Sequence, residues 1–165
     1  MQQAQTAIDA ARAAGAGDYA HDELTAAEQA LKNAHDAVDQ RDYRLALTSA
    51  LDSRARAENA ATAAADQKTA AHAEAERLLA ATSTALARAH TRLKSAQGTR
   101  GAPRTLATTR RTLDDADRAV QEARTTFAGS NYPAAIRTLK DVNTRLASVE
   151  RELDAAAPPA PRRKG

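Results

Sequence analysis

The chain contains no cysteine and very few aromatic residues. The missing thiols exclude disulfides, thiolate metal sites and cysteine nucleophiles. One Phe, three Tyr and no Trp leave few large side chains to bury. Burial stabilises a fold by roughly 25 cal/mol per Å² of apolar surface. A core built mainly from alanine methyl groups is therefore thin unless its helices approach each other closely.

Long hydrophobic runs are also missing. No stretch of about 18 apolar residues could cross a membrane. The first ten residues lack the basic and apolar regions of a signal peptide, so we expect none in this chain. A chain trimmed of its leader would look the same.

Glycine and proline are confined to a few places. Residues 43–97 contain neither, and alanine, the best helix former, is the commonest residue of the chain. An unbroken helix over these 55 residues would be roughly 80 Å long. No alternating β-branched runs predict strands. The predicted fold class is all-α, an elongated antiparallel helical bundle.

Turn and capping residues divide the chain into five predicted helices. Asp42 and Asn131 are good N-caps for two of them. The expected helices cover about 2–14, 21–40, 43–97, 103–128 and 131–157. The long central helix would be shared by two three-helix bundles, covering residues 1–70 and 71–157. We expect residues 158–165 to form a Pro/Arg-rich flexible tail. A reversal of the chain at 66–69 is the alternative that would give one compact bundle.

Apolar side chains recur at helical spacing along each helix. In the second helix the stripe continues to Val38, and at the start of the long helix we expect an ordinary buried face. That face consists of Tyr43, Ala46, Leu47, Ala50 and Leu51. From 52 to 77 only alanine continues the stripe, in heptad register. This middle part either packs closely on a partner helix or is a solvated connecting rod.

The sequence repeats itself at an offset of 89 residues. Each copy has a helix, a short polar turn that ends in Asp or Asn, a tyrosine, and a second helix. Tyr43 and Tyr132 mark the two copies. We expect each ring to pack against the preceding helix while its hydroxyl stays in water. A duplication explains the pattern better than chance similarity between two Ala-rich helices.

Residues 10–60 carry a family resemblance. The elements are the entry AxxAGAxxYAxxEL, a ladder of alanines, and the turn RDYxxAxxxA. They resemble an uncharacterised family of Ala-rich helical bacterial envelope lipoproteins, which often precede an OmpA-like peptidoglycan-binding domain. The resemblance implies export, an upstream lipid anchor and a non-enzymatic envelope role. Three expected departures from that family are the lack of a leader, of a cysteine to be lipidated and of an OmpA-like domain among the 165 residues given.

Charge is distributed unevenly along the chain. Residues 1–76 carry 7 basic and 13 acidic side chains, whereas residues 77–165 carry 17 and 8. No acid occurs between positions 77 and 111. This zone predicts a surface for an anionic envelope component, a lipid surface or an acidic protein, and the alternative is a solvated bundle end. Its candidate binding residues are Arg88, Arg92, Lys94, Arg100, Arg104, Arg110 and Arg111.

Chemistry-bearing motifs are lacking. The four histidines offer pairs such as His72 with Glu76 at i,i+4 spacing, but a closed metal site needs three or four ligands. No nucleophile elbow, P-loop or dinucleotide fingerprint occurs. Few aromatic residues are present to stack on bases, which argues against nucleic acid as a partner. We therefore expect no catalytic residues, no cofactor and no metal.

Three functional hypotheses follow. The first is a non-enzymatic helical interaction or spacer module of the bacterial cell envelope, periplasmic or envelope-associated if a leader was removed. The second is a cytoplasmic coiled-coil adaptor or self-associating Ala-rich bundle. The third is an anionic-surface binder that uses the basic region from 77 to 111. A protein partner or self-association is common to the first two.

Overall fold

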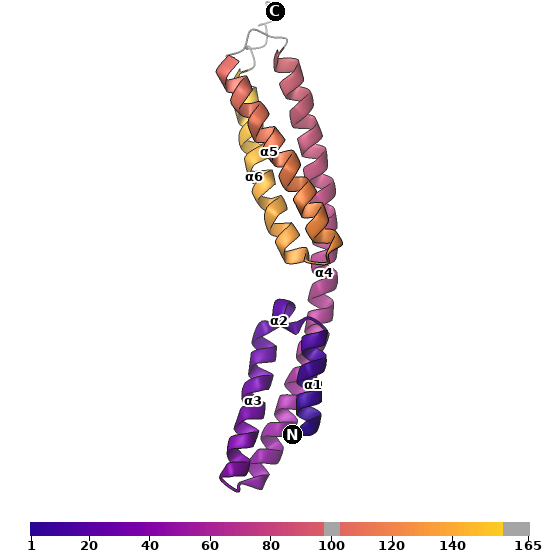
Figure 1. The fold of residues 1–165 in the computed structure, drawn as a ribbon, viewed down its shortest axis with the longest axis vertical. Coiled ribbons are helices and arrows are strands. Elements are labelled where there is room, and N and C mark those ends of the chain that lie inside the picture. The colour runs from indigo at the N-terminus through magenta and orange to yellow at the C-terminus, as the bar shows by residue number, and fades with distance from the viewer. Residues whose placement is uncertain (98–102, 157–165) are drawn as a thin grey trace, which may run out of the picture. The chain divides into compact units, whose positions relative to one another are not determined.

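The structure is a computed structural model that describes residues 1–97 and 103–156, so the predicted tail at 158–165 lies outside the described residues. The described residues are 93% helical, which confirms the all-α prediction. Figure 1 shows α4 lying alongside the other helices. The six helices of the described residues are α1 (Gln2–Ala13), α2 (Ala16–Tyr19), α3 (His21–Asp39), α4 (Tyr43–Gln97), α5 (Pro103–Ala128) and α6 (Tyr132–Ala156).

Helix α2 is one more helix than the sequence predicts. Gly15 adopts a φ of 90°, a left-handed conformation that glycine reaches without strain, and this ends α1. The chain then makes a single helical turn in which Ala16 is fully buried. Four residues are too few for a hydrophobic period, so the count of five helices was wrong at this turn.

Helix α4 begins and ends where the sequence predicts, at Tyr43 and Gln97. It continues through residues 66–69, so the reversal considered there does not occur. Both readings of its alanine middle apply, each to a different part. Ala57, Ala60 and Ala64 are fully buried in the core of the first three helices, whereas residues 65–70 are exposed.

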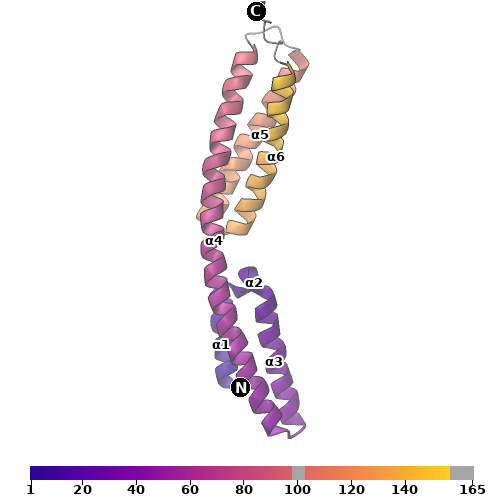
Figure 2. The same cartoon turned by 180° about the vertical axis from the view of Figure 1, so that it is seen from behind.

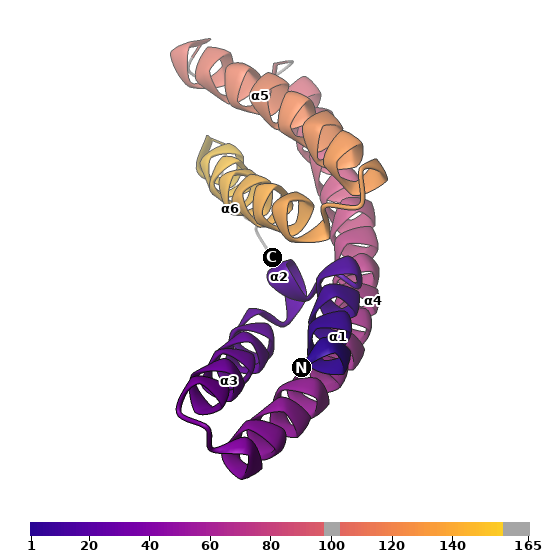
Figure 3. The same cartoon turned by 60° about the horizontal axis from the view of Figure 1, so that its bottom comes forward.

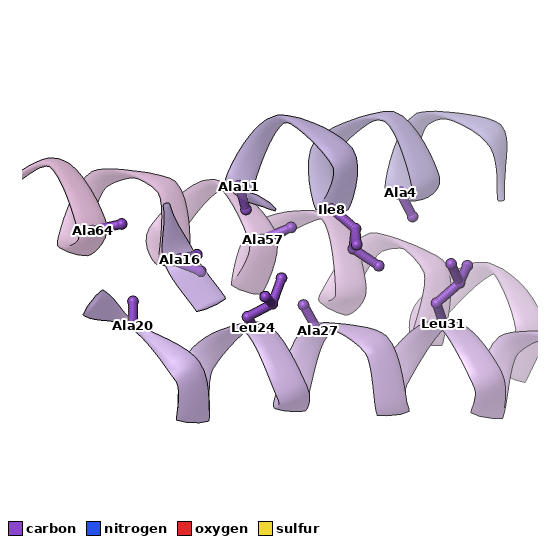
Figure 4. Close-up of a cluster of buried hydrophobic side chains, with 11 residues drawn as sticks. Ala4, Ile8, Ala11, Ala16, Ala20, Leu24, Ala27, Leu31, Ala57 and Ala64 are labelled. Atoms are coloured by element: carbon purple, nitrogen blue, oxygen red, sulfur yellow. The ribbon is translucent and has the colours of Figure 1, made fainter. Parts of the chain in front are cut away.

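The chain divides into two compact units, unit 1 (Met1–Ala70) and unit 2 (Ala71–Gly165). In unit 1, helices α1, α2 and α3 pack with the first part of α4. Figure 4 shows how few large side chains this core contains: Ile8, Leu24 and Leu31 lie among alanines. Alanine lets the helices approach closely, which is how a core of small side chains can exclude water.

Unit 2 combines the second part of α4 with α5 and α6. Figure 2 shows these three helices side by side. Their core is richer in large aliphatic side chains than that of unit 1. Its buried members include Leu86, Leu93, Leu113, Val120, Leu139, Val142, Leu146, Val149 and Leu153.

The α3–α4 and α5–α6 turns have the same geometry. Arg41 and Ser130, which are 89 positions apart, have φ angles of 60° and 62°. The predicted caps are confirmed: Asp42 Oδ1 accepts from the N–H of Leu45 at 2.9 Å, and Asn131 Oδ1 accepts from the N–H of Ala134 at 3.3 Å. The offset of 89 residues therefore relates two equivalent helical hairpins.

Candidate interaction surfaces

Two predicted basic residues lie together on unit 2. Arg88 and Arg92 are exposed on α4 and line one shallow surface groove. Glu150 of α6 lines the same groove, and Arg92 Nη1 lies 2.9 Å from Asp154 Oδ1. The zone without acids in the sequence thus has acidic neighbours in the fold, because α6 lies beside α4.

Three other predicted basic residues are described outside the lining of this groove. Lys94, Arg110 and Arg111 are exposed, the first on α4 and the other two on α5. Arg104 belongs to α5, but its side chain lies outside the described part of the structure. Arg100 as a whole also lies outside it. The predicted anionic-surface site therefore has a described centre at Arg88 and Arg92, where opposite charge is already close.

The marker Tyr132 packs as the sequence predicts. Its ring lies 5.3 Å from that of Phe127 on the preceding helix α5, measured between centroids. His72 of α4 closes the cluster, with its ring 5.0 Å from each of the other two. Edge-to-face and tilted rings at such separations attract each other. His72 is therefore half-buried against the α5–α6 turn, a role that its sequence position does not reveal.

The marker Tyr43 behaves differently, and here the sequence prediction was wrong. Tyr43 is 68% exposed, and on the same face of α4 Leu47 is 63% and Leu51 56% exposed. Only Ala46 and Ala50 of the predicted buried face are buried. Val38, at the end of the apolar stripe of α3, is 40% exposed. We call Val38, Tyr43, Leu47 and Leu51 the unit 1 apolar patch.

The position of α1 explains this patch. The Arg54 guanidinium donates to Gln3 Oε1 at 3.2 Å, and Arg12 forms an ion pair with Glu28 at 2.7 Å. Helix α1 thus runs parallel to α4 and antiparallel to α3, and it begins level with Leu51. Figures 1 and 3 show α3 and α4 extending beyond the start of α1 toward their shared turn. Periodicity identified this apolar face of α4, but it could not show that α1 covers only part of the face.

Glu74 of α4 has a shifted pKa. Lys140 Nζ lies 2.8 Å from Glu74 Oε1. The hydrogen bond and the attraction of Lys140 lower the pKa of Glu74 below its ordinary value, and Arg77 adds to the effect. This is an exposed pair that joins α4 to α6, so its role is in packing unit 2.

The described residues hold no cluster of three or more side chains that could bind a metal ion. Within the same residues, no helix is long and apolar enough to cross a membrane. Comparison with known proteins gives no match, either to a protein-family model, to a curated protein or to a solved structure.

Proposed function

We propose that this chain is a non-enzymatic helical interaction and spacer module of the bacterial cell envelope. The observation that carries the interaction role is the unit 1 apolar patch. Large aliphatic side chains more than half exposed on one helix face are characteristic of a binding surface. The spacer role is supported by the length of α4, whose 55 residues belong to both units.

The envelope assignment is supported by the resemblance of residues 10–60 to the Ala-rich envelope lipoproteins. The non-enzymatic assignment is supported by a sequence that brings no base beside a nucleophile and carries no cofactor motif. The cytoplasmic adaptor differs from this proposal in its compartment, and the self-associating bundle differs in its partner.

Crosslinking in the native host tests the interaction role. A photoreactive amino acid replaces Leu47, and in a matched variant it replaces Leu45, which is also exposed but lies on nearly the opposite side of α4. We expect a discrete protein adduct from position 47 and none from position 45. Adducts that are equal at both positions, or absent from both, would contradict the proposal. Fractionation of the same cells distinguishes the envelope from the cytoplasm.

The anionic-surface function is weaker on this structure. Arg92 is paired with Asp154, and Arg88 shares its groove with Glu150, so a ligand there would compete with acids already in place. Binding of the chain to anionic vesicles that disappears in an Arg88→Glu, Arg92→Glu variant would favour this function over the interaction module.

A further inference from the structure

Unit 2 shows what the unit 1 apolar patch lacks. At the offset of 89 residues, Val38, Tyr43 and Leu47 correspond to Phe127, Tyr132 and Ile136. The two sets stand on equivalent hairpins with equivalent turns. Yet Phe127, Tyr132 and Ile136 are half-buried, whereas their unit 1 counterparts are exposed. The difference must come from the third helix of each unit.

The third helices correspond closely where both exist. In unit 1, Arg12 of α1 pairs with Glu28. In unit 2, His90 of α4 contacts Asp117, which is the counterpart of Glu28, at 2.8 Å. Counting back from this contact, buried side chains of α1 match buried side chains of α4. The matched pairs are Ala11 with Ala89, Ile8 with Leu86, and Ala4 with Thr82.

The unit 2 helix then continues where α1 stops. In this register Met1 corresponds to Leu79, and residues 72–78 of α4 have no counterpart among the described residues of unit 1. These two turns, together with Leu79, do the covering in unit 2. His72 packs on Phe127 and Tyr132, and Leu78 and Leu79 pack with Leu139 and Ile136. The unit 1 apolar patch thus continues the face of the α3–α4 hairpin that α1 covers only in part.

We propose that the unit 1 apolar patch binds an amphipathic α-helix of a partner protein, laid end to end with α1 against α3 and α4. This inference rests on the proposed interaction function and names the partner's chemistry. The argument is continuity, because the occupant extends an interface that α1 has already made. The bound helix would run parallel to α4 and antiparallel to α3, as α1 does.

Comparison of the patch with unit 2 also specifies the partner's residue pattern. Small or aliphatic residues belong at the positions equivalent to Ala75 and Leu78, and a flat ring at that of His72 would pack on Tyr43. One position differs between the units. Unit 2 has Lys140 paired with Glu74, whereas the unit 1 counterpart of Lys140 is Leu51. An apolar residue therefore suits the partner where α4 has Glu74, since Leu51 offers a carboxylate no cation to pair with.

The test supplies such a helix at high effective concentration. The sequence of residues 66–78, with Glu74→Leu, is fused ahead of residue 1 of the full chain, where Met1→Leu completes the register. Tethering offsets the ordering cost that makes a short free helix marginal in water. We expect amide hydrogen exchange of residues 47–51 to slow by about tenfold or more, because the covered amides open less often. Amides of unit 2 should not change.

Two matched controls make the result specific. In the first control, the fused helix carries Gln at the equivalents of Glu74, Ala75 and Leu78 and at position 1, and it should give no protection. Leu47→Gln in the chain should abolish the protection given by the apolar fusion, whereas Leu45→Gln should leave it intact. Protection that is absent from the apolar fusion, or equal in the Gln-substituted fusion, would overturn the proposed helix partner.

Sedimentation equilibrium of the unfused chain distinguishes a partner helix from a second copy of the chain as the occupant of the patch. A monomer that gains protection only from the helix supports the proposal. A dimer that Leu47→Gln converts to a monomer, and Leu45→Gln does not, would assign the patch to a second copy and overturn it. If a longer polypeptide isolated from the host protects the same amides with its own upstream residues, that result also overturns it. An adduct at position 47 without helix-induced protection would leave the interaction function standing and reject only the helical partner.

Discussion

The two units contain equivalent helical hairpins that differ at the end where the turn lies. In unit 2, His72, Leu78 and Leu79 cover the side chains beside the α5–α6 turn. In unit 1, α1 begins level with Leu51 and leaves the corresponding side chains in contact with water. The comparison teaches that an apolar stripe determines which face of a helix is available for packing. The length of the neighbouring helix determines how much of that face is used.

The largest expected effect tests whether the third helices are equivalent where both exist. Ile8→Ala in unit 1 and Leu86→Ala in unit 2 should each cost about 2–5 kcal/mol, because each removes a buried aliphatic side chain and leaves a cavity. Denaturant-dependent hydrogen exchange, followed separately for the two units, measures both losses. A large loss for Leu86→Ala beside a negligible one for Ile8→Ala would mean that α1 does not pack as described.

The next pair of variants addresses the ends where the units differ. Ile136→Ala should destabilise unit 2 by about 1–2 kcal/mol, since this half-buried side chain packs on the third helix. Leu47→Ala should change the stability of unit 1 by no more than about 0.5 kcal/mol, because its side chain is largely exposed. The same exchange experiment compares them. Equal costs would remove the distinction between a covered and an uncovered end.

Smaller effects are expected at the two caps, which should behave alike. Asp42→Ala and Asn131→Ala each remove a side-chain acceptor from the first turn of a helix, at a cost of about 1 kcal/mol. Thermal unfolding by circular dichroism would detect both. A cost at only one of these positions would show that the hairpins differ in their turns as well as in their covering helix.

The smallest effect concerns the pair that has no counterpart in unit 1. Lys140→Gln should return the pKa of Glu74 toward its ordinary value, since the main cause of the lowering is gone. A lowered pKa in the folded state stabilises unit 2 above the ordinary glutamate pKa of about 4.3, and this contribution is lost as pH falls through the lowered value. The variant should lose that part of the pH dependence. Carboxyl ¹³C NMR titration measures the pKa, and an unchanged value would contradict the assignment.

Much of the fold could be predicted because its signals are local. The bounds of α4 follow from a stretch without glycine or proline, and Asp42 and Asn131 identify their helix starts by their capping chemistry. Helix α2 was missed because one turn after Gly15 carries no periodicity. Leu47 and Leu51 were predicted to be buried, since a sequence stripe cannot show where a helix from elsewhere in the chain begins.

The candidate surfaces were predicted less well for the same reason. Arg88 and Arg92 were correctly placed on one helix face, but Glu150 and Asp154 come from α6 and are distant in sequence. His72 looks like an ordinary polar residue of an Ala-rich helix until the fold places it against Phe127 and Tyr132. Each missed feature depends on which parts of two different helices lie side by side in the fold.

The central claim is that unit 1 has an uncovered end and unit 2 does not. Native-state hydrogen exchange of the unmodified chain tests it most directly, by comparing amide protection along the second helix of each hairpin. In unit 1, protection should fall by about tenfold or more from residues 57–64 to residues 47–51, because the latter lie beyond α1. In unit 2, residues 136–140 should be protected nearly as well as residues 146–153. An equal gradient in both units, or none in unit 1, would contradict the account.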